Sequence, residues 1–203
     1  MKRSLKDKVV WITGAGSGIG QNAAITLSNL GMKVILSGRD EKKLEITSNQ
    51  CVNNTIIKPL DVSDNDKVES VSESIIREFK KIDILINSAG TNVEHRDWDV
   101  INKSDWDNIF NTNVNGLFYC CKSTLPHMKK EKDGLIINIS SWAGREVSLL
   151  SGVTYTSSKH AVNAMTETIN MKYCNFGIRA CALCPGEVST PILDKRPKKL
   201  SEE

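Results

Sequence analysis

Long apolar runs, prolines and low-complexity tracts are scarce in this sequence, and their scarcity limits what the chain can be. With five prolines in 203 residues and no repetitive tract, the chain is expected to form one domain with a substantial core. The first apolar run, residues 9–12, is too short for a signal sequence or a membrane-spanning helix. We therefore interpret this run as a strand of a cytoplasmic protein without a membrane partner.

A strong excess of either charge is also absent. Lys and Arg number 27 and Asp and Glu number 24, which gives a net charge of +3 at pH 7, and the basic residues are scattered. This balance predicts no nucleic-acid-binding face. The sequence ends in a charged run, KRPKKLSEE. It predicts a flexible tail over residues 193–203 behind a single domain of residues 1–192.

Metal ligands at a suitable spacing are the third missing feature. The three histidines, at positions 95, 127 and 160, are too dispersed to indicate a metal site. Cys181 and Cys184 have CxxC spacing, but residues three apart in a strand point to opposite faces, and no second pair of ligands follows. We expect no metal and interpret these two cysteines as buried structural thiols.

What the sequence does have is a regular alternation of strand and helix patterns. Apolar, β-rich segments typical of strands lie at residues 8–13, 33–37, 55–59, 83–87, 134–140 and 178–184. Helical patterns lie between them at residues 21–30, 41–50, 64–80, 104–128 and 153–176. The alternation predicts an α/β fold with a doubly wound parallel sheet of six strands, covered by helices on both faces in three layers.

A glycine-rich turn joins the first strand to the first helix. Its sequence, GAGSGIG, lacks the last glycine of the common GxGxxG pattern because Ile19 occupies that position. The spacing that fits is Gly14-x-x-x-Gly18-x-Gly20, in which glycines permit a tight turn and a close approach of the backbone to a pyrophosphate. A glycine-rich turn without a ligand is the alternative interpretation.

Tyr155 and Lys159 stand four residues apart in an expected helix, which places both side chains on one face. A phenol with a pKa of about 10 is a poor base, but a neighbouring ammonium and a helix N-terminus, with Thr154 as the expected cap, would lower that pKa. Ser141 follows a strand and can face the same crevice. Taken alone, the pair is more typical of an ordinary surface pair on an amphipathic helix.

Polar residues at two other places have two interpretations each. Asp61, followed by Val62, comes after the third strand, where its carboxylate either accepts a hydrogen bond from an adenine amino group or caps the next helix. Asn113, Asn115 and Gly116 interrupt an otherwise apolar helix. Either the helix is distorted there, or a side-chain amide is needed at that point.

Six short motifs stand in one order along the chain. They are TGAGSGIG, NSAG, NVNG, ISSWAG, YTSSK and PGEVST. Together they resemble the short-chain dehydrogenase/reductase family over almost the whole chain. The resemblance implies a Rossmann-like fold and an oxidoreductase that transfers a hydride between NAD(P) and a small alcohol or ketone. It also implies four catalytic residues.

In that resemblance, Tyr155 is the acid or base toward the substrate oxygen and Ser141 polarises that oxygen. Lys159 binds the nicotinamide ribose and lowers the pKa of Tyr155, and Asn113 holds a water of a proton relay. Ser141, Trp142 and Tyr155 are the expected substrate contacts. The expected cofactor-binding residues are Gly14, Ser17, Gly18, Ile19, Gly20, Arg39, Asp61, Val62, Asn87, Ala89, Gly90, Tyr155, Lys159, Pro185, Gly186, Val188 and Thr190.

The resemblance further implies a homodimer or homotetramer with a small-molecule substrate. Two departures from the family pattern accompany it. The motif at residues 87–90 is NSAG where the family more usually has NNAG, and the family's usual seventh strand is missing because the sequence ends at Glu203. The alternative function is therefore a non-catalytic nucleotide-binding protein or an inactive truncated fragment of such an enzyme.

The residues after the second strand predict that NADP is preferred over NAD. A carboxylate that selects NAD is expected about 20 residues past the glycine turn, and by register with the family that position is Gly38. Arg39 can instead offer its planar guanidinium to a 2′-phosphate, and Ser17 can add a hydroxyl. Asp40 would reverse the preference if it faced the ribose, although the N-cap of the next helix is its simpler role.

Overall fold

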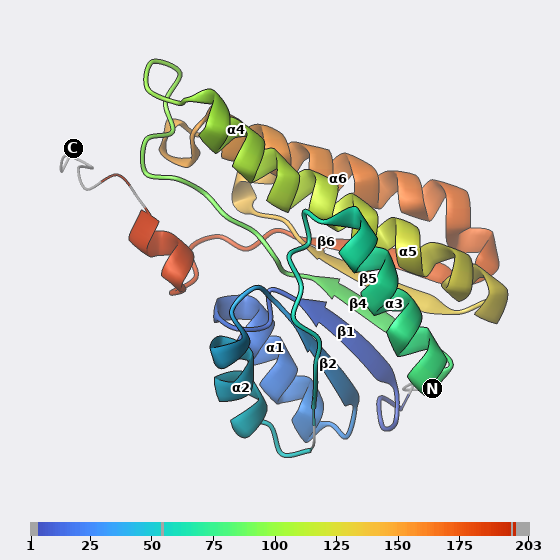
Figure 1. Ribbon diagram of the computed structural model, residues 1–203. Helices are drawn as coiled ribbons and strands as arrows, with labels where there is room; N and C mark the ends of the chain where they lie inside the picture. Colours follow the sequence, from blue (N-terminus) through green and yellow to red (C-terminus); the bar gives the residue numbers. More distant parts are fainter. Residues whose placement is uncertain (1–3, 54, 196, 198–203) are drawn as a thin grey trace.

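The computed structural model describes residues 4–53, 55–195 and 197, and a parallel sheet of six strands lies at the centre of this part of the chain (Figure 1). The strands are β1 (Val9–Thr13), β2 (Lys33–Ser37), β3 (Ile56–Ile57), β4 (Ile84–Asn87), β5 (Gly134–Ile139) and β6 (Ile178–Leu183). Their order in the sheet is β3-β2-β1-β4-β5-β6, and each neighbouring pair is parallel. The predicted doubly wound α/β fold is confirmed.

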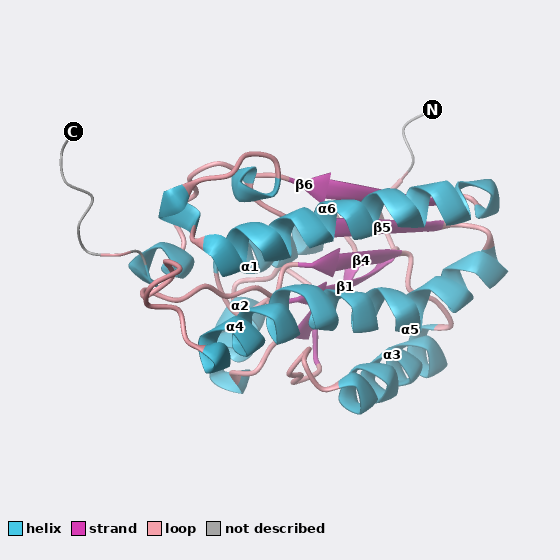
Figure 2. Cartoon of the chain, turned by 90° about the horizontal axis from the view of Figure 1, so that it is seen from above, coloured by secondary structure: helices cyan, strands magenta, loops and turns pink. Residues whose placement is uncertain are grey.

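Helices cover both faces of the sheet (Figures 1 and 2). One face carries α1 (Gly18–Asn29) and α2 (Glu41–Asn49), and the other carries α3 (Asn65–Phe79), α4 (Lys103–Phe110), α5 (Gly116–Glu131) and α6 (Val153–Tyr173). Alternate residues of β1 therefore enter two cores: Trp11 packs on the α3, α5 and α6 side, and Ile12 packs on the α1 and α2 side. Within the described ranges, no helix has both the length and the apolar character needed to cross a bilayer.

The segment expected to be one helix over residues 104–128 is two helices separated by a π-helical turn. The turn comprises Asn111–Asn115, between the end of α4 and the start of α5 at Gly116. A Cβ at Gly116 would lie 2.5 Å from Cγ2 of Val62, so the chain can pass this close only with glycine there. The predicted distortion at the asparagines is confirmed, and the turn directs Asn113 into the interior, where it is 1% exposed.

The first turns of two helices differ from the sequence-based expectation. α1 begins at Gly18 and not at Gln21, so the last glycines of the glycine-rich turn belong to the helix itself. The N-cap of α6 is Gly152, whose φ of +76° favours glycine. Thr154, which we expected to be the cap, is instead buried inside the first turn of α6.

β6 forms one edge of the sheet, and one of its faces is open. Arg179, Cys181 and Leu183 are exposed on β6, because α1 and α2 lie over β1 and β2 and do not extend this far across the sheet (Figure 1). The interpretation of Cys181 as a buried thiol is therefore wrong, and Cys184 is half-buried. A strand that is covered by helices on only one face exposes every second side chain. The CxxC spacing gives no information on whether one face or both faces of the strand are covered.

The outer edge of β6 is closed near its middle by Asn170 of α6. The carbonyl of Leu183 accepts a hydrogen bond from Ser140, beside β5, so the peptide groups of Ala180 face away from β5. The amide of Ala180 donates to Oδ1 of Asn170 at 2.7 Å, and Nδ2 of Asn170 donates to the carbonyl of Ala180 at 2.8 Å. The side chain of Asn170 thus occupies the backbone groups of Ala180, which would otherwise be free to pair with a strand of another chain.

We predict that Asn170→Ala lowers the free energy of unfolding by about 1–2 kcal/mol, because two hydrogen bonds to the edge strand are lost. The variant should also self-associate more, since the Ala180 peptide groups become available for pairing. Chemical denaturation and light scattering over a concentration series measure the two effects. Thr168→Ala on the same helix, where the hydroxyl bonds the carbonyl of Met165, is the control. If Asn170→Ala had the same stability and the same self-association as Thr168→Ala, the bonds of Asn170 would not be what keeps the edge of β6 from pairing with another chain.

Candidate active site

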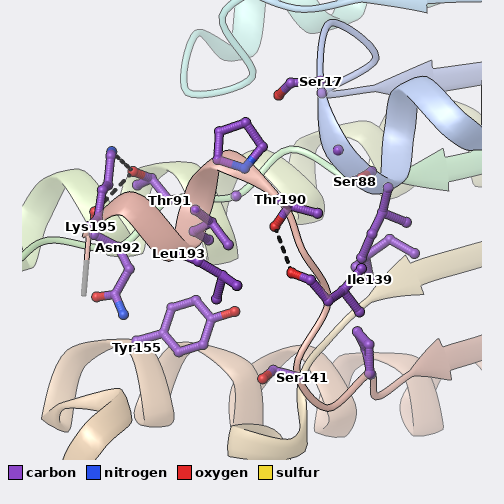
Figure 3. A pocket seen from close by; sticks show the side chains of 18 of the residues that line it. Ser17, Ser88, Thr91, Asn92, Ile139, Ser141, Tyr155, Thr190, Leu193 and Lys195 are labelled. Carbon is purple, nitrogen blue, oxygen red and sulfur yellow. Dashed lines mark hydrogen bonds between the residues drawn. The ribbon is translucent and has the colours of Figure 1, made fainter. Parts of the chain in front are cut away.

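The carboxyl ends of the central strands open onto a pocket of about 420 Å³ (Figure 3). A parallel sheet brings these ends to one edge, where the loops that follow them meet the N-termini of helices. The predicted site residues that line this pocket are Gly14, Ser17, Gly18, Ile19, Arg39, Gly90, Ser141, Tyr155, Lys159, Pro185, Gly186, Val188 and Thr190. The fold therefore assembles most of the predicted site from segments that are far apart in the sequence.

A smaller cavity of about 190 Å³ shares part of this lining, including Gly14 and Arg39. The predicted residues Asp61, Val62 and Ala89 line it as well. The two cavities together form an elongated site with the glycine-rich turn between its ends. Such a shape suits a ligand with two bulky halves joined by a phosphate linker.

The two aspartates near the smaller cavity have different roles. Asp40 accepts a hydrogen bond from the amide of Lys43 at 3.2 Å and caps α2, as the simpler interpretation predicted. Asp61 does not cap α3, because Asp64 does so. The carboxylate of Asp61 accepts hydrogen bonds from Ser63 instead. The capping interpretation of Asp61 is therefore wrong. Its position in the wall of the smaller cavity is consistent with the alternative, in which the carboxylate accepts a hydrogen bond from an adenine amino group.

The glycine-rich turn fits a ligand that must approach the backbone closely. Gly14 has a φ of +67°, and a Cβ there would lie 2.6 Å from the backbone nitrogen of Ala89. At Gly20 a Cβ would lie 2.4 Å from the carbonyl oxygen of Gly14, so the helix can pack on the turn only with glycine at both positions. The N-terminus of α1 then faces the pocket at Gly18, and its unpaired amides and dipole favour an anionic group there.

Tyr155 lies near the start of α6, and its hydroxyl faces Ser141 across the pocket floor (Figure 3). Burial raises the pKa of Tyr155, whereas a hydrogen bond with Ser141 and the positive charge of Arg96 act to lower it. The net direction of the Tyr155 pKa is therefore upward, whereas the expected direction was downward. Burial is the largest influence, and the ammonium of Lys159, 5.4 Å from the centre of the phenol ring, is bonded elsewhere.

Lys159 is a buried cation, only 4% exposed. Its Nζ donates to the backbone carbonyl of Ile139 at 2.8 Å. Burial lowers the pKa of Lys159 to about 8, and the adjacent Cys184 acts in the opposite direction. A Cβ at Gly90 would lie 3.7 Å from this Nζ, so the glycine leaves the ammonium accessible from the pocket.

Asn113 is close to the pocket but does not line it. Its Oδ1 accepts from the amide of Thr91 at 2.8 Å, and its Nδ2 donates to the carbonyl of Thr91 at 3.0 Å and to Oγ of Ser158 at 3.1 Å. The side-chain amide thus ties the loop after β4 to the π-helical turn and to α6. In this position the side-chain amide holds the loop in place, and the binding of a water by Asn113 stays a prediction.

Three more predicted residues, Gly20, Asn87 and Trp142, do not line either cavity. Gly20 supports the turn through its packing on Gly14. Nδ2 of Asn87 donates to Oδ1 of Asn138 at 2.9 Å inside the sheet, so Asn87 links β4 to β5. Trp142 is 55% exposed beside the pocket and contributes no wall to it.

The pocket has further walls besides the predicted site residues. The sequence also predicts a substrate pocket lined by residues 91–98, residues 142–150 and the C-terminal tail, and these segments supply Thr91, Asn92, Arg96, Leu150, Leu193 and Lys195. Lys43, Ser88 and Ser151 were not expected. Lys43 could have been noticed, because it follows Arg39 at the spacing of one helical turn in a segment predicted to start a helix. The others lie on loops, where periodicity gives no signal.

The residues after the last strand form part of the pocket. A 3-10 turn, Pro191–Lys195, crosses its mouth, and Nζ of Lys195 donates to Oγ1 of Thr91 at 2.9 Å (Figure 3). The guanidinium of Arg96 donates to the carbonyl of Lys195 and, at 3.1 Å, to the carbonyl of Leu150. The expected boundary at residue 192 therefore cuts through a pocket wall. Residues 196 and 198–203 of the expected tail lie outside the described residues.

Comparisons with known proteins agree with this geometry. The family model described as short chain dehydrogenase matches residues 8–201. An uncharacterised oxidoreductase of Staphylococcus aureus strain MRSA252 is 35% identical over 191 residues, which cover 93% of this chain and 81% of the relative.

Two solved structures are also similar. One is the 3-ketoacyl-(acyl-carrier-protein) reductase of Brucella melitensis complexed with NADH, at 29% identity and a TM-score of 0.89, covering 95% of this chain and 80% of that one. The other is a metagenomic short-chain oxidoreductase in complex with NADP, at 28% identity and a TM-score of 0.86, covering 91% of this chain and 85% of that one.

The buried ammonium of Lys159 should reduce stability. A pKa lowered from 10.5 to about 8 corresponds to a cost of about 3 kcal/mol for keeping the charge in the folded state. We predict that Lys159→Met, which removes the charge at similar volume, raises the free energy of unfolding at pH 7 by about 1–2 kcal/mol, after allowing for the lost bond to Ile139.

The gain from Lys159→Met should shrink as pH rises from about 8 toward 10.5. In that range the unfolded wild type binds more protons at Lys159 than the folded one, so wild-type stability increases with pH. Urea denaturation of both proteins at pH 7 and pH 9.5 measures the difference. A variant that is less stable than the wild type at pH 7 would show that the ammonium stabilises the fold.

Proposed function

This chain belongs to the short-chain dehydrogenase family, and from that premise we propose that it transfers a hydride between a nicotinamide cofactor and the carbonyl or alcohol carbon of a small molecule. The observation that carries the proposal is the convergence of Ser141, Tyr155 and Lys159 at one end of an elongated site. The glycine-rich turn and the N-terminus of α1 lie in the middle of that site, and the smaller cavity, lined by Arg39 and Asp61, forms its other end. NADH and NADP, which the two solved structures hold, have the dimensions and charge that such a site fits.

The side chains supply proton transfer and orientation for this reaction. When bound, the nicotinamide supplies or accepts the hydride. Tyr155 exchanges a proton with the substrate oxygen, and Ser141, hydrogen-bonded to it, orients the same oxygen. Lys159 places a positive charge beneath Gly90, where it can bind a ribose hydroxyl and stabilise phenolate as Tyr155 loses its proton. No metal ion is required for these steps.

Tyr155 is protonated at neutral pH, as any phenol with a pKa at or above its ordinary value is. Its side chain lines the pocket together with Ser141 and can donate to a bound substrate oxygen there. Reduction of a ketone or aldehyde needs a proton donor at the forming alkoxide. We therefore propose carbonyl reduction with Tyr155 as the acid.

We propose NADP as the preferred cofactor. Arg39 and Lys43 both line the cavities beyond the glycine-rich turn, and Asp40 is engaged as the cap of α2. The two cations can bind a 2′-phosphate, and the carboxylate of Asp40 is occupied in capping α2. This arrangement favours a cofactor with a 2′-phosphate over one with two free ribose hydroxyls. Asp61 lies in the same cavity, where its carboxylate can accept from an adenine amino group.

The remaining proposed contacts lie at the nicotinamide end. Val188 and Thr190 follow β6 and line the pocket near Gly18, so they are placed to bind a carboxamide.

We propose that Asn113 is a positioning residue that keeps the Thr91 loop against α6. Its amide bonds to Thr91 and Ser158 account for this role without a water.

We propose that the chain forms a homodimer or homotetramer through α5 and α6. Phe118 on α5 is 48% exposed and Met171 on α6 is 82% exposed, on the helix layer that faces away from the sheet. Apolar side chains left in solvent on neighbouring helices are typical of an association surface.

Tyr155→Phe should abolish reduction of carbonyl substrates while leaving cofactor binding nearly intact, because the ring remains and the transferable proton is removed. Nicotinamide absorbance with a panel of ketones and aldehydes measures turnover, and cofactor fluorescence measures binding. Tyr173→Phe, at the far end of α6, is the control and should keep the wild-type rate. Wild-type kcat in Tyr155→Phe would refute Tyr155 as the acid.

Arg39→Ala should weaken the use of NADP and barely affect the use of NAD. Loss of a charged hydrogen bond to the 2′-phosphate is expected to cost about 1.5–3 kcal/mol in kcat/KM for NADPH. The ratio of kcat/KM for NADPH and NADH is measured before and after the change, with Arg77→Ala on α3 as the control. Equal losses for both cofactors would mean that Arg39 supports the loop and does not bind the phosphate.

A further inference from the structure

The wall of the larger pocket carries charge of one sign. Among the described residues that line it, the charged ones are Arg39, Lys43, Arg96, Lys159 and Lys195, and none is Asp or Glu. Arg39 and Lys43 lie at the glycine-rich end and Lys159 lies beside the phenol, so the phosphates and ribose of a dinucleotide account for those three. The cofactor does not account for Arg96 and Lys195.

Lys195 lies at the end of the pocket away from the glycine-rich turn. In Figure 3 Lys195, Thr91 and Asn92 lie on one side of the pocket together with the Tyr155 ring, and Ser17 and Ser88 lie on the other side. A ligand group that reaches Lys195 therefore extends from the Tyr155 end of the site, away from the glycine-rich turn. This is the region where the part of the substrate beyond its reacting carbon would lie.

The position of the Lys195 ammonium is fixed from both ends of the residue. Arg96 donates to the backbone carbonyl of Lys195, which holds the turn over the pocket. Nζ of Lys195 donates to the hydroxyl of Thr91 at 2.9 Å, and Thr91 is only 6% exposed. The Thr91 hydroxyl donates to the carbonyl of Asn92 at 3.4 Å, a long bond that a carboxylate oxygen can replace. The ammonium and this hydroxyl are then a suitable pair of donors for one carboxylate group.

Arg96 adds to the positive potential at this end. The residue is 5% exposed, and its charge is close enough to Tyr155 to act on the phenol pKa. Its guanidinium donates to the carbonyls of Leu150 and Lys195, so part of its hydrogen-bonding capacity holds the two pocket walls together. The charge still acts on the pocket, because Coulomb interactions are weakly screened where water is largely excluded.

We propose that the substrate of this site carries a carboxylate on the side away from its reacting carbonyl, and that Lys195 and Thr91 bind it with Arg96 behind them. The inference rests on the proposed function, because it places the reacting carbon at Tyr155. A carboxylate fits better than a phosphate, since the single ammonium of Lys195 matches a single negative charge. The substrate class is therefore that of oxo acids or hydroxy acids.

The test is calorimetric titration of the full chain, saturated with NADP⁺, with hexanoate and with hexanamide in low-salt buffer. The two probes have nearly the same shape and differ in charge, and neither can react. The wild type should bind hexanoate at least about 10-fold more tightly than hexanamide, the scale of a charged hydrogen bond. Lys195→Gln should remove most of this preference, and because the side chain is exposed the change leaves no buried cavity. Lys67→Gln on α3, with the same change of charge, should keep it.

Three results would overturn the inference: equal affinity for the two probes, no binding of hexanoate, or a preference that persists in Lys195→Gln. The titration is repeated in Tyr155→Phe, which should bind hexanoate like the wild type. The proposed function is tested by turnover and this inference by binding, so the two can fail separately. Wild-type turnover in Tyr155→Phe refutes the former, and equal affinity of the wild-type chain for hexanoate and hexanamide refutes the latter.

Discussion

All strands of the sheet run in the same direction, and the rest of the site depends on this constraint. Parallel strands end at one edge, so the glycine-rich turn after β1, the loop after β4 and Ser141 after β5 meet there without any local signal linking them. Each return crossover is a helix whose N-terminus also begins at that edge. The N-termini of α1 and α6 thus deliver unpaired amides and Tyr155 to opposite sides of one pocket.

The same arrangement concentrates positive charge, and this has a cost. Lys159 is buried against the carbonyl of Ile139 with its pKa lowered, so the folded state holds a partly desolvated ammonium. Burial of Tyr155 raises the pKa of the phenol, which favours its neutral form. At neutral pH only Lys159 reduces stability, because Tyr155 is a neutral phenol in both the folded and the unfolded state. Anionic ligands would compensate for the positive charge of the site.

Much of this architecture could be predicted from the sequence, because it depends on short-range patterns. Apolar runs located the strands, and the four-residue spacing of Tyr155 and Lys159 placed both side chains in one pocket. Gly14 and Gly20 were expected to permit close approach, and their contacts require it. The interruption at Asn113 was expected from the poor helix propensity of asparagine and glycine, and it is a π-helical turn.

The rest depends on tertiary packing that no local pattern reports. The direction of the Tyr155 pKa follows from burial, and Asn87 turns into the sheet because Asn138 lies opposite it. Cys181 is exposed because the helices on its face do not reach β6, and Lys195 joins the pocket because Arg96 holds its turn there. Such long-range contacts cannot be inferred from the spacing of residues along the chain.

The central claim is that the nicotinamide and Tyr155 act on the same substrate carbonyl group, the nicotinamide on its carbon and Tyr155 on its oxygen. Mass spectrometry of the product formed from a ketone and NADPH deuterated at C4 of the nicotinamide tests it directly, with each face of the ring labelled in turn. The account predicts that one label, and only one, appears on the new carbinol carbon, because the bound ring presents a single face. An alcohol product that contains no deuterium from either label would contradict direct hydride transfer in this pocket.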